Sequence, residues 1–467
     1  EHKFVQGVMG IFGHGNVTGL GEALEYGGTG LRYIQGNNEQ GLVHAATAYA
    51  KQKNRLGIFA CTSSIGPGAT NMITGAATAT VNRIPVLLLP GDVFASRQPD
   101  PVLQQIETPW DHTINANNAF KPVSRYWDRI ERPDQLMIAG LNAMRVLTDP
   151  VETGAVTLCL PQDTQAEAFD YPESFLGKKV WHLDRRAPHP RALKEAVSIL
   201  SSAQKPLIVA GGGVHYSQAA ETLRGFAETF GIPVSETQAG KSAMSWKDPM
   251  SVGAVGVTGT SAANLLAKAA DVVLVVGSRL QDFTTASKQI FASDVKLLHL
   301  NVSKFDGLKM DSIMLQADAK SGLESLREKL NKAGFQTSTE YRGYVSKLRS
   351  EWNAEVDRLY NLTSKEGNVQ TSIVGTLNEF MAPEDVVLCA AGSLPGDLHR
   401  LWRSEIPKTY HMEYGYSCMG YEVAGGLGAK MAMEKGEVYI IVGDGSYLML
   451  HSEILTALKE HVKINIV

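Results

Sequence analysis

Short apolar runs alternate with longer amphipathic segments along most of the chain. The apolar runs have the length and the flanking Gly or Pro residues that are typical of β-strands, and they fall into three series. These series predict strands at residues 7–12, 56–61, 85–89 and 156–160, then at 206–210, 272–276 and 296–300, and finally at 386–390, 438–442 and 463–467. Strands that alternate with helices form parallel sheets covered by helices, so the pattern predicts an α/β fold.

The three series of strands divide the chain into three predicted domains. A length of 467 residues fits about three domains of roughly 150 residues each. A strongly charged helical segment is the expected linker, and it ends in a break that contains Ser, Asn and Gly. We expect doubly wound parallel-sheet domains at residues 1–170, 185–330 and 369–467, the last of them incomplete at its C-terminal end, with the linker at 331–368 and its break at 363–368.

The composition argues against several classes of protein. With 44 Lys and Arg against 48 Asp and Glu, the net charge is −4 and no segment concentrates basic residues, so nucleic acid is not an expected partner. No apolar run approaches the roughly 18 residues of a membrane-spanning helix, and the first residues do not resemble a signal peptide, so we expect a cytoplasmic protein. The four cysteines form no Cys-x-x-Cys pair, which favours small buried side chains over a zinc site or a disulfide framework.

A Gly-Asp-Gly-Ser turn, residues 443–446, follows the predicted strand at 438–442 and precedes a predicted helix at 452–460. The carboxylate of Asp444 would offer a hard oxygen ligand to Mg²⁺, and the backbone N–H groups of the turn would bind phosphate oxygens. An ordinary strand-turn-helix junction explains the same pattern. The turn alone therefore leaves both interpretations open.

Glu39 is a lone carboxylate at the start of an Ala-rich helical segment with an apolar face. A buried carboxyl group at such a place can share a proton with a ring nitrogen, which is the task of a general acid or base. The alternative is simple stabilisation of the N-terminus of the helix by an acidic residue.

Glycine-rich turns follow the carboxyl ends of two other predicted strands. Gly66-Pro67-Gly68 opens onto a helix of small residues, and it would let a ligand approach the backbone or let the helix pack closely on the sheet. Gly392-Ser393 and Met419-Gly420, which lie in the third series, could border a single ligand, although a turn and a core-filling Met are the ordinary explanations.

Four of these motifs stand in an order that carries a family resemblance: residues 39–41, 66–71, 419–420 and 443–446. The chain resembles, over nearly its whole length, the thiamine-diphosphate enzymes related to acetohydroxyacid synthase. The resemblance implies a pyrimidine-binding first domain, a Rossmann-like middle domain and a diphosphate-binding third domain. It also implies a homodimer or homotetramer with the cofactor between subunits; it leaves flavin binding by the middle domain undecided.

The resemblance assigns roles to individual residues. Glu39 would hydrogen-bond the aminopyrimidine ring and favour the imino tautomer, whose nitrogen removes the thiazolium C2 proton. Met419 would hold the two rings of the cofactor in their bent form, and Asp444 would be the Mg²⁺ ligand. The remaining expected cofactor contacts are Ser64, Gly66, Asn71, Gly392, Ser393, Leu394, Gly443, Gly445 and Ser446.

Further segments, among them residues 12–16, 83–92 and 96–105, are similar to the branch of this family that acts in myo-inositol catabolism. That similarity implies hydrolytic opening of a carbon–carbon bond in a polyhydroxylated cyclic 1,2-dione, which yields 5-deoxy-D-glucuronate. A polyhydroxylated ring needs several hydrogen-bonding partners, and a surface or capping role is the alternative for each candidate. By loop position these candidates are His14, Asn16, Arg97, Gln104, Gln105, Lys288 and His411.

The sequence departs from the family pattern at two places. The second metal ligand of the family is an Asn roughly 27 residues after the Asp, which would place it beyond residue 467. The break at 363–368 is also shorter than in the family. We expect residues to be missing at both termini and near 361–370.

Three other functions compete with the expected one. The nearest is a thiamine-diphosphate-dependent carboligase or decarboxylase that acts on 2-oxo acids such as pyruvate. A nicotinamide-dependent dehydrogenase is suggested by Gly211-Gly212-Gly213 after a strand, but the full Gly-x-Gly-x-x-Gly spacing is absent. A non-catalytic scaffold would bind no thiamine diphosphate.

Overall fold

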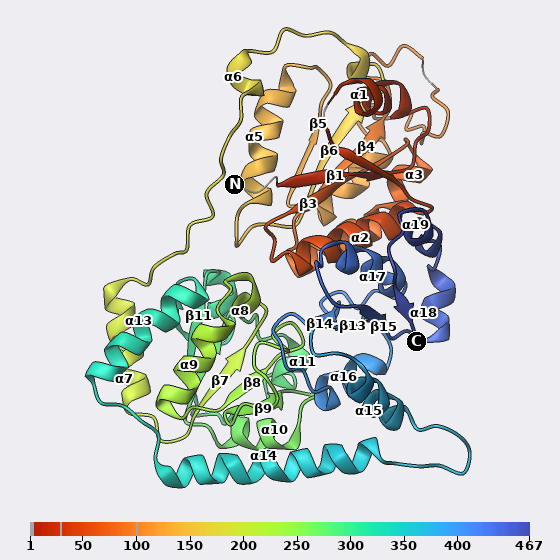
Figure 1. Cartoon of the computed structure of the whole chain (residues 1–467). Coiled ribbons are helices and arrows are strands. Elements are labelled where there is room, and N and C mark those ends of the chain that lie inside the picture. Colours follow the sequence, from red (N-terminus) through yellow and green to blue (C-terminus); the bar gives the residue numbers. More distant parts are fainter. Residues whose placement is uncertain (1–3, 29, 100) are drawn as a thin grey trace. The chain divides into compact units, whose positions relative to one another are not determined.

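The computed structural model describes residues 4–28, 30–99 and 101–467 (Figure 1). Within them the strands form three sheets with helices interleaved along the chain, and the recorded strand pairs run parallel. The predicted α/β fold with parallel sheets is therefore confirmed. By its internal contacts the chain forms two compact units. The first unit comprises Glu1–Leu183, Leu388–Ala391 and Gly415–Val467, and the second comprises Asp184–Val387 and Gly392–Tyr414.

The first unit contains a six-stranded sheet with the order β2-β1-β3-β4-β6-β5. Met9, Cys61 and Leu88, which are paired across three neighbouring strands and so share one face of this sheet, are completely buried. The strands are β1 Val5–Gly10, β2 Arg32–Gln35, β3 Ile58–Ser63, β4 Val86–Asp92, β5 Tyr126–Arg129 and β6 Ala155–Pro161. The helices of this unit are α1 Glu22–Tyr26, α2 Glu39–Gln52, α3 Pro67–Asn71, α4 Ile73–Asn82, α5 Gln135–Leu147, α6 Glu173–Leu176, α17 Tyr421–Met431, α18 Asp444–Met449 and α19 Glu453–Lys459, with short η1 Val17–Gly21, η2 Ala116–Val123 and η3 Thr164–Ala166.

Helices α2 and α17 pack directly against each other in the first unit (Figure 1). The contact is so close that a Cβ atom on Gly428 would overlap with the carbonyl oxygen of Ala45. Both helices are buried on nearly every side, which fits their content of Gly and Ala. Small side chains let the two backbones approach, so the glycine at this crossing is a packing requirement.

The second unit contains a six-stranded sheet with the order β12-β11-β10-β7-β8-β9. Its strands are β7 Pro206–Ala210, β8 Val234–Glu236, β9 Ser251–Ala254, β10 Val272–Val276, β11 Lys296–Asn301 and β12 Ile313–Gln316. Its helices are α7 Pro190–Ser201, α8 Gly213–Tyr216, α9 Ala220–Phe230, α10 Ser261–Ala269, α11 Asp282–Thr285, α12 Lys304–Leu308, α13 Ala319–Lys332, α14 Thr339–Tyr360, α15 Gln370–Phe380 and α16 Leu394–Leu401. Helix α14, within the predicted linker, buries Tyr341, Val345 and Leu348 in the core of this unit.

A third sheet of four strands has the order β14-β13-β15-β16. Its strands are β13 Val386–Cys389, β14 Tyr410–Met412, β15 Val438–Ile440 and β16 Asn465–Ile466. Helix α18 begins at Asp444 itself, so the chain passes from the strand region into a helix earlier than the sequence pattern predicts.

Two expectations from composition are tested by the fold. Within the described ranges, none of the helices combines the length and the apolar character that crossing a membrane requires. Among the described residues the four cysteines form no disulfide bond, and Cys61, Cys159 and Cys389 are buried as expected. Cys418 departs from that expectation because it is only partly buried.

Exchange of Gly428 for Ala should destabilise the first unit, because the new methyl group would meet the backbone of α2. Overpacking of this kind costs about 1–3 kcal/mol. A lower midpoint in urea unfolding, followed by circular dichroism, would show it. The matched control is Gly343→Ala in α14, where a Cβ atom meets nothing within 4 Å and where Ala should be neutral or stabilising by up to about 1 kcal/mol. Equal midpoints for Gly428→Ala and the unaltered protein would contradict the packing argument.

Candidate active site

Glu39 is the first residue of α2, and its side chain is 9% exposed. The preceding Asn38 caps the helix, since its Oδ1 atom accepts hydrogen bonds from the N–H groups of Gln40 at 2.9 Å and Gly41 at 3.2 Å. The Nδ2 atom of Asn71, at the end of α3, donates to Oε2 of Glu39 at 3.0 Å. The structure thus brings together two residues that the sequence predicted separately.

Two glycines, which lack side chains, let the turn between β3 and α3 pack closely against neighbouring residues. Gly66 has φ +58°, and a Cβ atom there would overlap with the carbonyl oxygen of Gln104. A Cβ atom on Gly68 would lie 3.0 Å from Oε1 of Glu39. Ser64 lies at the same turn, where its Oγ accepts a long hydrogen bond of 3.4 Å from the N–H of Gly15. The lack of a side chain therefore lets Gly66 pack against the loop at Gln104 and lets Gly68 pack against the carboxylate of Glu39.

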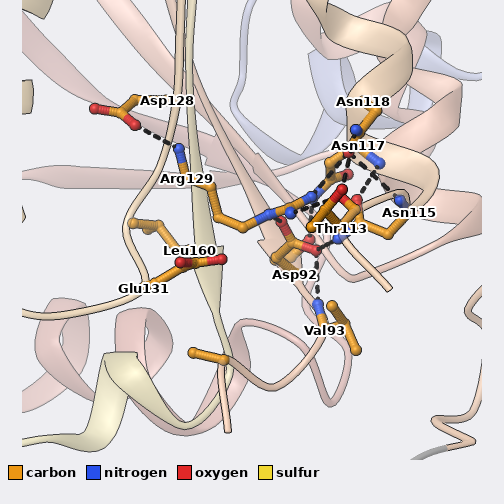
Figure 2. Close-up of polar contacts among 12 residues, drawn as sticks. Asp92, Val93, Thr113, Asn115, Asn117, Asn118, Asp128, Arg129, Glu131 and Leu160 are labelled. Atoms are coloured by element: carbon orange, nitrogen blue, oxygen red, sulfur yellow. Dashed lines mark hydrogen bonds and ion pairs between the residues drawn. The ribbon is translucent and has the colours of Figure 1, made fainter. Parts of the chain in front are cut away.

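The loop that carries Arg97, Gln104 and Gln105 is anchored at its base by a buried ion pair. Asp92, at the end of β4, accepts hydrogen bonds from Nε of Arg129 at 2.8 Å and from Nδ2 of Asn115 at 2.7 Å (Figure 2). Burial raises the pKa of Asp92, and the charge of Arg129 opposes that rise. These contacts tie both ends of the segment between residues 92 and 115 to the sheet.

Arg129 extends from β5 and binds this segment at further points (Figure 2). Its Nη1 atom donates to the carbonyl oxygen of Thr113 at 3.2 Å and its Nη2 atom to Oδ1 of Asn118 at 2.9 Å. Asn117 donates to the carbonyl oxygen of Gly91 at 2.9 Å. The guanidinium group therefore joins the two ends of the loop, a role that the sequence did not reveal.

The candidates for substrate contact in the first unit differ in their surroundings. His14 and Gln105 each have a buried polar atom, Nε2 and Oε1 respectively, without a partner among the described residues. Arg97 and Gln104 are exposed and have positive φ values of 57° and 66°. Asn16 is 1% exposed, and its amide donates to the Ile11 carbonyl and Thr62 Oγ1 and accepts from the N–H of Gly13. These contacts favour a supporting role for Asn16.

Two further candidates lie in the second unit. Lys288 follows α11, is exposed and has φ 68°. His411 lies in strand β14 and is 1% exposed, which corrects the expectation that it occupies a loop. The residues on either side, Tyr410 and Met412, are buried and hydrophobic, and their burial explains why this segment is a buried strand.

The predicted diphosphate turn has an exposed carboxylate at Asp444. Oδ1 of Asp444 accepts a hydrogen bond from the N–H of Gly445 at 2.8 Å, and a Cβ atom on Gly443 would meet nothing within 4 Å. Met419 is 41% exposed, and its Cε atom lies 3.5 Å from the place of a Cβ atom on Gly445. Asp444 and Met419 thus border the same open turn.

The hydroxyl group of Ser446 is engaged by neighbouring groups of the protein, and the contact of Ser446 with a diphosphate stays a prediction. Ser446 is 5% exposed, and its Oγ donates to Oε2 of Glu422 at 2.6 Å while it accepts from the N–H of Gly420 at 2.7 Å. Oε1 of Glu422 accepts from the N–H of Ala391 at 3.1 Å. The hydroxyl is engaged in holding the turn before α17, where Gly420 has φ +90°.

The second predicted diphosphate turn belongs to the second unit. Gly392 has φ +86°, and a Cβ atom there would meet nothing within 4 Å. Ser393 is exposed, and Leu394 is the first residue of α16. The turn is therefore open beside Gly392.

Glu453 is the residue at this site that sequence reasoning missed. It is the first residue of α19 and 1% exposed, and its Oε1 atom accepts from the N–H groups of Asn37 at 3.2 Å and Asn38 at 2.9 Å. Its Oε2 atom accepts from Oγ1 of Thr456 at 2.5 Å, and burial raises the pKa of the carboxyl group. The available signal was a lone acid within the mostly apolar segment 448–458. Glu453 fixes the two residues that precede Glu39.

These residues suit a thiamine diphosphate molecule and a divalent cation. Glu39 offers a carboxylate that Asn71 orients, and Asp444 offers an exposed carboxylate beside the open turn at Gly443. Across the described parts of the chain there is no cluster of three or more His, Cys, Asp or Glu side chains that could hold a metal ion. A magnesium ion needs only one or two protein carboxylates when phosphate oxygens complete its shell.

Exchange of Glu453 for Ala should loosen the segment before Glu39, because the N–H groups of Asn37 and Asn38 would lose their acceptor. Buried donors without partners cost roughly 1–3 kcal/mol. We expect faster amide hydrogen exchange at residues 37–41 and a lower unfolding midpoint, measured by mass spectrometry and circular dichroism. Glu434→Ala, at an exposed position, is the control and should change neither. Unchanged exchange at 37–41 in Glu453→Ala would refute the anchoring role.

Models of three thiamine pyrophosphate enzyme domains match the chain. The N-terminal TPP binding domain matches residues 2–113, the central domain residues 193–326 and the C-terminal TPP binding domain residues 390–467.

Curated relatives match the chain over its whole length. Proteins from Clostridium tetani (strain Massachusetts / E88), Bacillus cereus (strain AH820) and Bacillus thuringiensis (strain Al Hakam) are each 52% identical to it. Each alignment covers 100% of this chain and 76% of the relative. All three carry the name 3D-(3,5/4)-trihydroxycyclohexane-1,2-dione hydrolase. The three domain matches and this identity show that the chain belongs to the thiamine pyrophosphate enzyme family.

Proposed function

We propose that this protein hydrolyses 3D-(3,5/4)-trihydroxycyclohexane-1,2-dione and opens its ring by cleaving a carbon–carbon bond, with thiamine diphosphate as cofactor. The observation that carries the proposal is the 52% identity, over the whole chain, to relatives that bear this activity in their names. The matching TPP binding domains support the cofactor. The arrangement around Glu39 supplies the acid–base group that such chemistry needs.

Thiamine diphosphate, when bound, supplies an electron sink for the cleaved carbon–carbon bond, which no side chain can provide. Glu39 is proposed to exchange a proton with the aminopyrimidine ring. Asn71 holds one carboxylate oxygen at 3.0 Å, which orients the group, and Gly68 packs against the other oxygen. Burial of Glu39 limits the access of water to this proton.

Asp444 is proposed to bind Mg²⁺ together with diphosphate oxygens, because its carboxylate is exposed at an open turn. We assign backbone contacts with the diphosphate to Gly392, Ser393 and Gly443. The side chain of Met419 is proposed to support the cofactor rings, since 41% of it is exposed.

His14 and Gln105 are the strongest candidates for contact with the polyhydroxylated ring, because each has a buried polar atom that lacks a partner in the described ranges. Arg97 and Gln104 lie with Gln105 on the loop whose ends Arg129 holds. Lys288 stays a prediction from sequence.

The active protein is proposed to be a homodimer or a larger homo-oligomer. Apolar side chains are exposed at Met419 and on helices α18 and α19, and water would leave them if a second copy covered them. These side chains are Met419 at 41%, Leu448 at 69%, Met449 at 65%, Leu455 at 53% and Leu458 at 66% exposure. The cytoplasmic location stays a prediction from sequence.

The proposed function is tested by incubating the full-length protein with thiamine diphosphate and Mg²⁺, with the cyclic dione or, separately, with pyruvate. We expect a product heavier than the dione by one water molecule, identified by mass spectrometry, and no turnover of pyruvate. A matched incubation without cofactor should show no turnover. Conversion of pyruvate with no reaction of the dione would instead establish a carboligase or decarboxylase and refute the proposal.

A further inference from the structure

The second unit contains a cavity that none of the roles described above uses. Its volume is about 40 Å³, and it lies between β9, helix α14 and the C-terminal end of α16. Arg349 and Arg403 line it from α14 and from the segment after α16, and Arg400 lines it from α16 itself. The buried side chains of Lys241, Glu236 and Ser404 complete the polar part of its wall. The cavity is therefore rich in positive charge.

Two of the three arginines are held rigidly. Nη2 of Arg349 donates to the carbonyl oxygens of Trp246 at 2.8 Å and Lys247 at 3.0 Å. The guanidinium carbon of Arg403 lies 4.4 Å from the ring centre of Trp246, and its Nη2 atom donates to the carbonyl oxygen of Asn353 at 3.0 Å. Carbonyl bonds and stacking fix the planes of both groups without neutralising their charge.

The positive charges of the cavity exceed the negative ones. Arg403 pairs with Asp357 at 2.7 Å, and Glu236 offsets the charge of Lys241. Neither Arg349 nor Arg400 forms an ion pair within the described parts of the chain; Asp248 acts on Arg349 only at longer range. Two guanidinium groups therefore lack a direct counter-charge.

Buried polar atoms at the same wall lack partners. These atoms, for which the described residues provide no hydrogen-bond partner, are Nε of Arg349, Arg400 and Arg403 and Oγ of Ser404. Partly buried cations without a counter-ion and donors without acceptors both destabilise a fold. An anion with several acceptor oxygens would offset both deficits at once.

The size of the cavity limits the ligand. A volume of about 40 Å³, at roughly 10–15 Å³ for each water molecule, holds a few non-hydrogen atoms and no nucleotide base. Guanidinium groups bind phosphate oxygens through paired N–H donors. We propose that this cavity binds a phosphate-sized oxyanion between Arg349, Arg400 and Arg403, either as free inorganic phosphate or as the phosphate group of a small phosphomonoester.

The test is a titration of the full-length protein, saturated with thiamine diphosphate and Mg²⁺ so that phosphate cannot enter the cofactor site. Inorganic phosphate is added at constant ionic strength, with chloride as the balancing salt. We expect a saturable rise of the thermal unfolding midpoint and a saturable change of tryptophan fluorescence, because Trp246, Trp352 and Trp402 line the cavity. A parallel titration with glycerol phosphate shows whether a phosphomonoester binds more tightly than the free ion.

Arg400→Gln is the decisive variant. Arg400 forms no hydrogen bond or ion pair with another described residue, so the exchange removes none. We expect its half-saturating phosphate concentration to rise at least tenfold, with an unchanged unfolding midpoint in phosphate-free buffer. Arg358→Gln, on the exposed face of α14 beside Glu355, should bind phosphate like the unaltered protein. A response to phosphate no greater than the response to chloride, or equal phosphate binding by Arg400→Gln, would overturn the proposal.

Discussion

The contact between α2 and α17 is the constraint on which the arrangement of the candidate active site depends. Glu39 begins α2, and Met419 and Gly420 precede α17, so the crossing of the two helices sets where both starting points lie. The crossing requires Gly428, because any side chain there would meet the backbone of α2. Packing between two helices of small residues thus fixes residues that are far apart in sequence.

Buried carboxylates complete this arrangement. Their hydrogen-bond partners distinguish the carboxylates that support the backbone from the one that is the candidate acid or base. Glu422 accepts hydrogen bonds from Ser446 and from the N–H groups of Gly420 and Ala391, and Glu453 binds the backbone before Glu39. These bonds offset the cost of burying a charge. The carboxylate of Glu39 accepts a hydrogen bond from Asn71 at Oε2 and packs against Gly68 at Oε1. Glu39 is the buried acid that we propose exchanges a proton with a ligand.

The sequence predicted strongly apolar elements well, because local patterns determine them. Strands β7 and β10 have the predicted bounds, and Glu39 begins a helix as expected. The supporting network was not predictable, since its partners are far apart: Asn37 and Glu453 are separated by 416 positions. The position of His411 in a strand was misjudged for the same reason, and the hydrogen bond from Ser446 to Glu422 could not be predicted from a local motif either. Local motifs identify reactive groups, and only the fold shows which polar groups are already engaged.

The role of Glu39 as the proton-exchanging group is tested most directly by the exchange of the C2 proton of bound thiamine diphosphate in D₂O, followed by quenching and NMR. With Glu39→Gln, the cofactor should still bind, and C2 exchange should slow by roughly 10²–10⁴-fold, the usual contribution of a positioned acid or base. Glu25→Gln, at an exposed position in α1, should exchange like the unaltered protein. An unchanged exchange rate in cofactor-saturated Glu39→Gln would contradict the account.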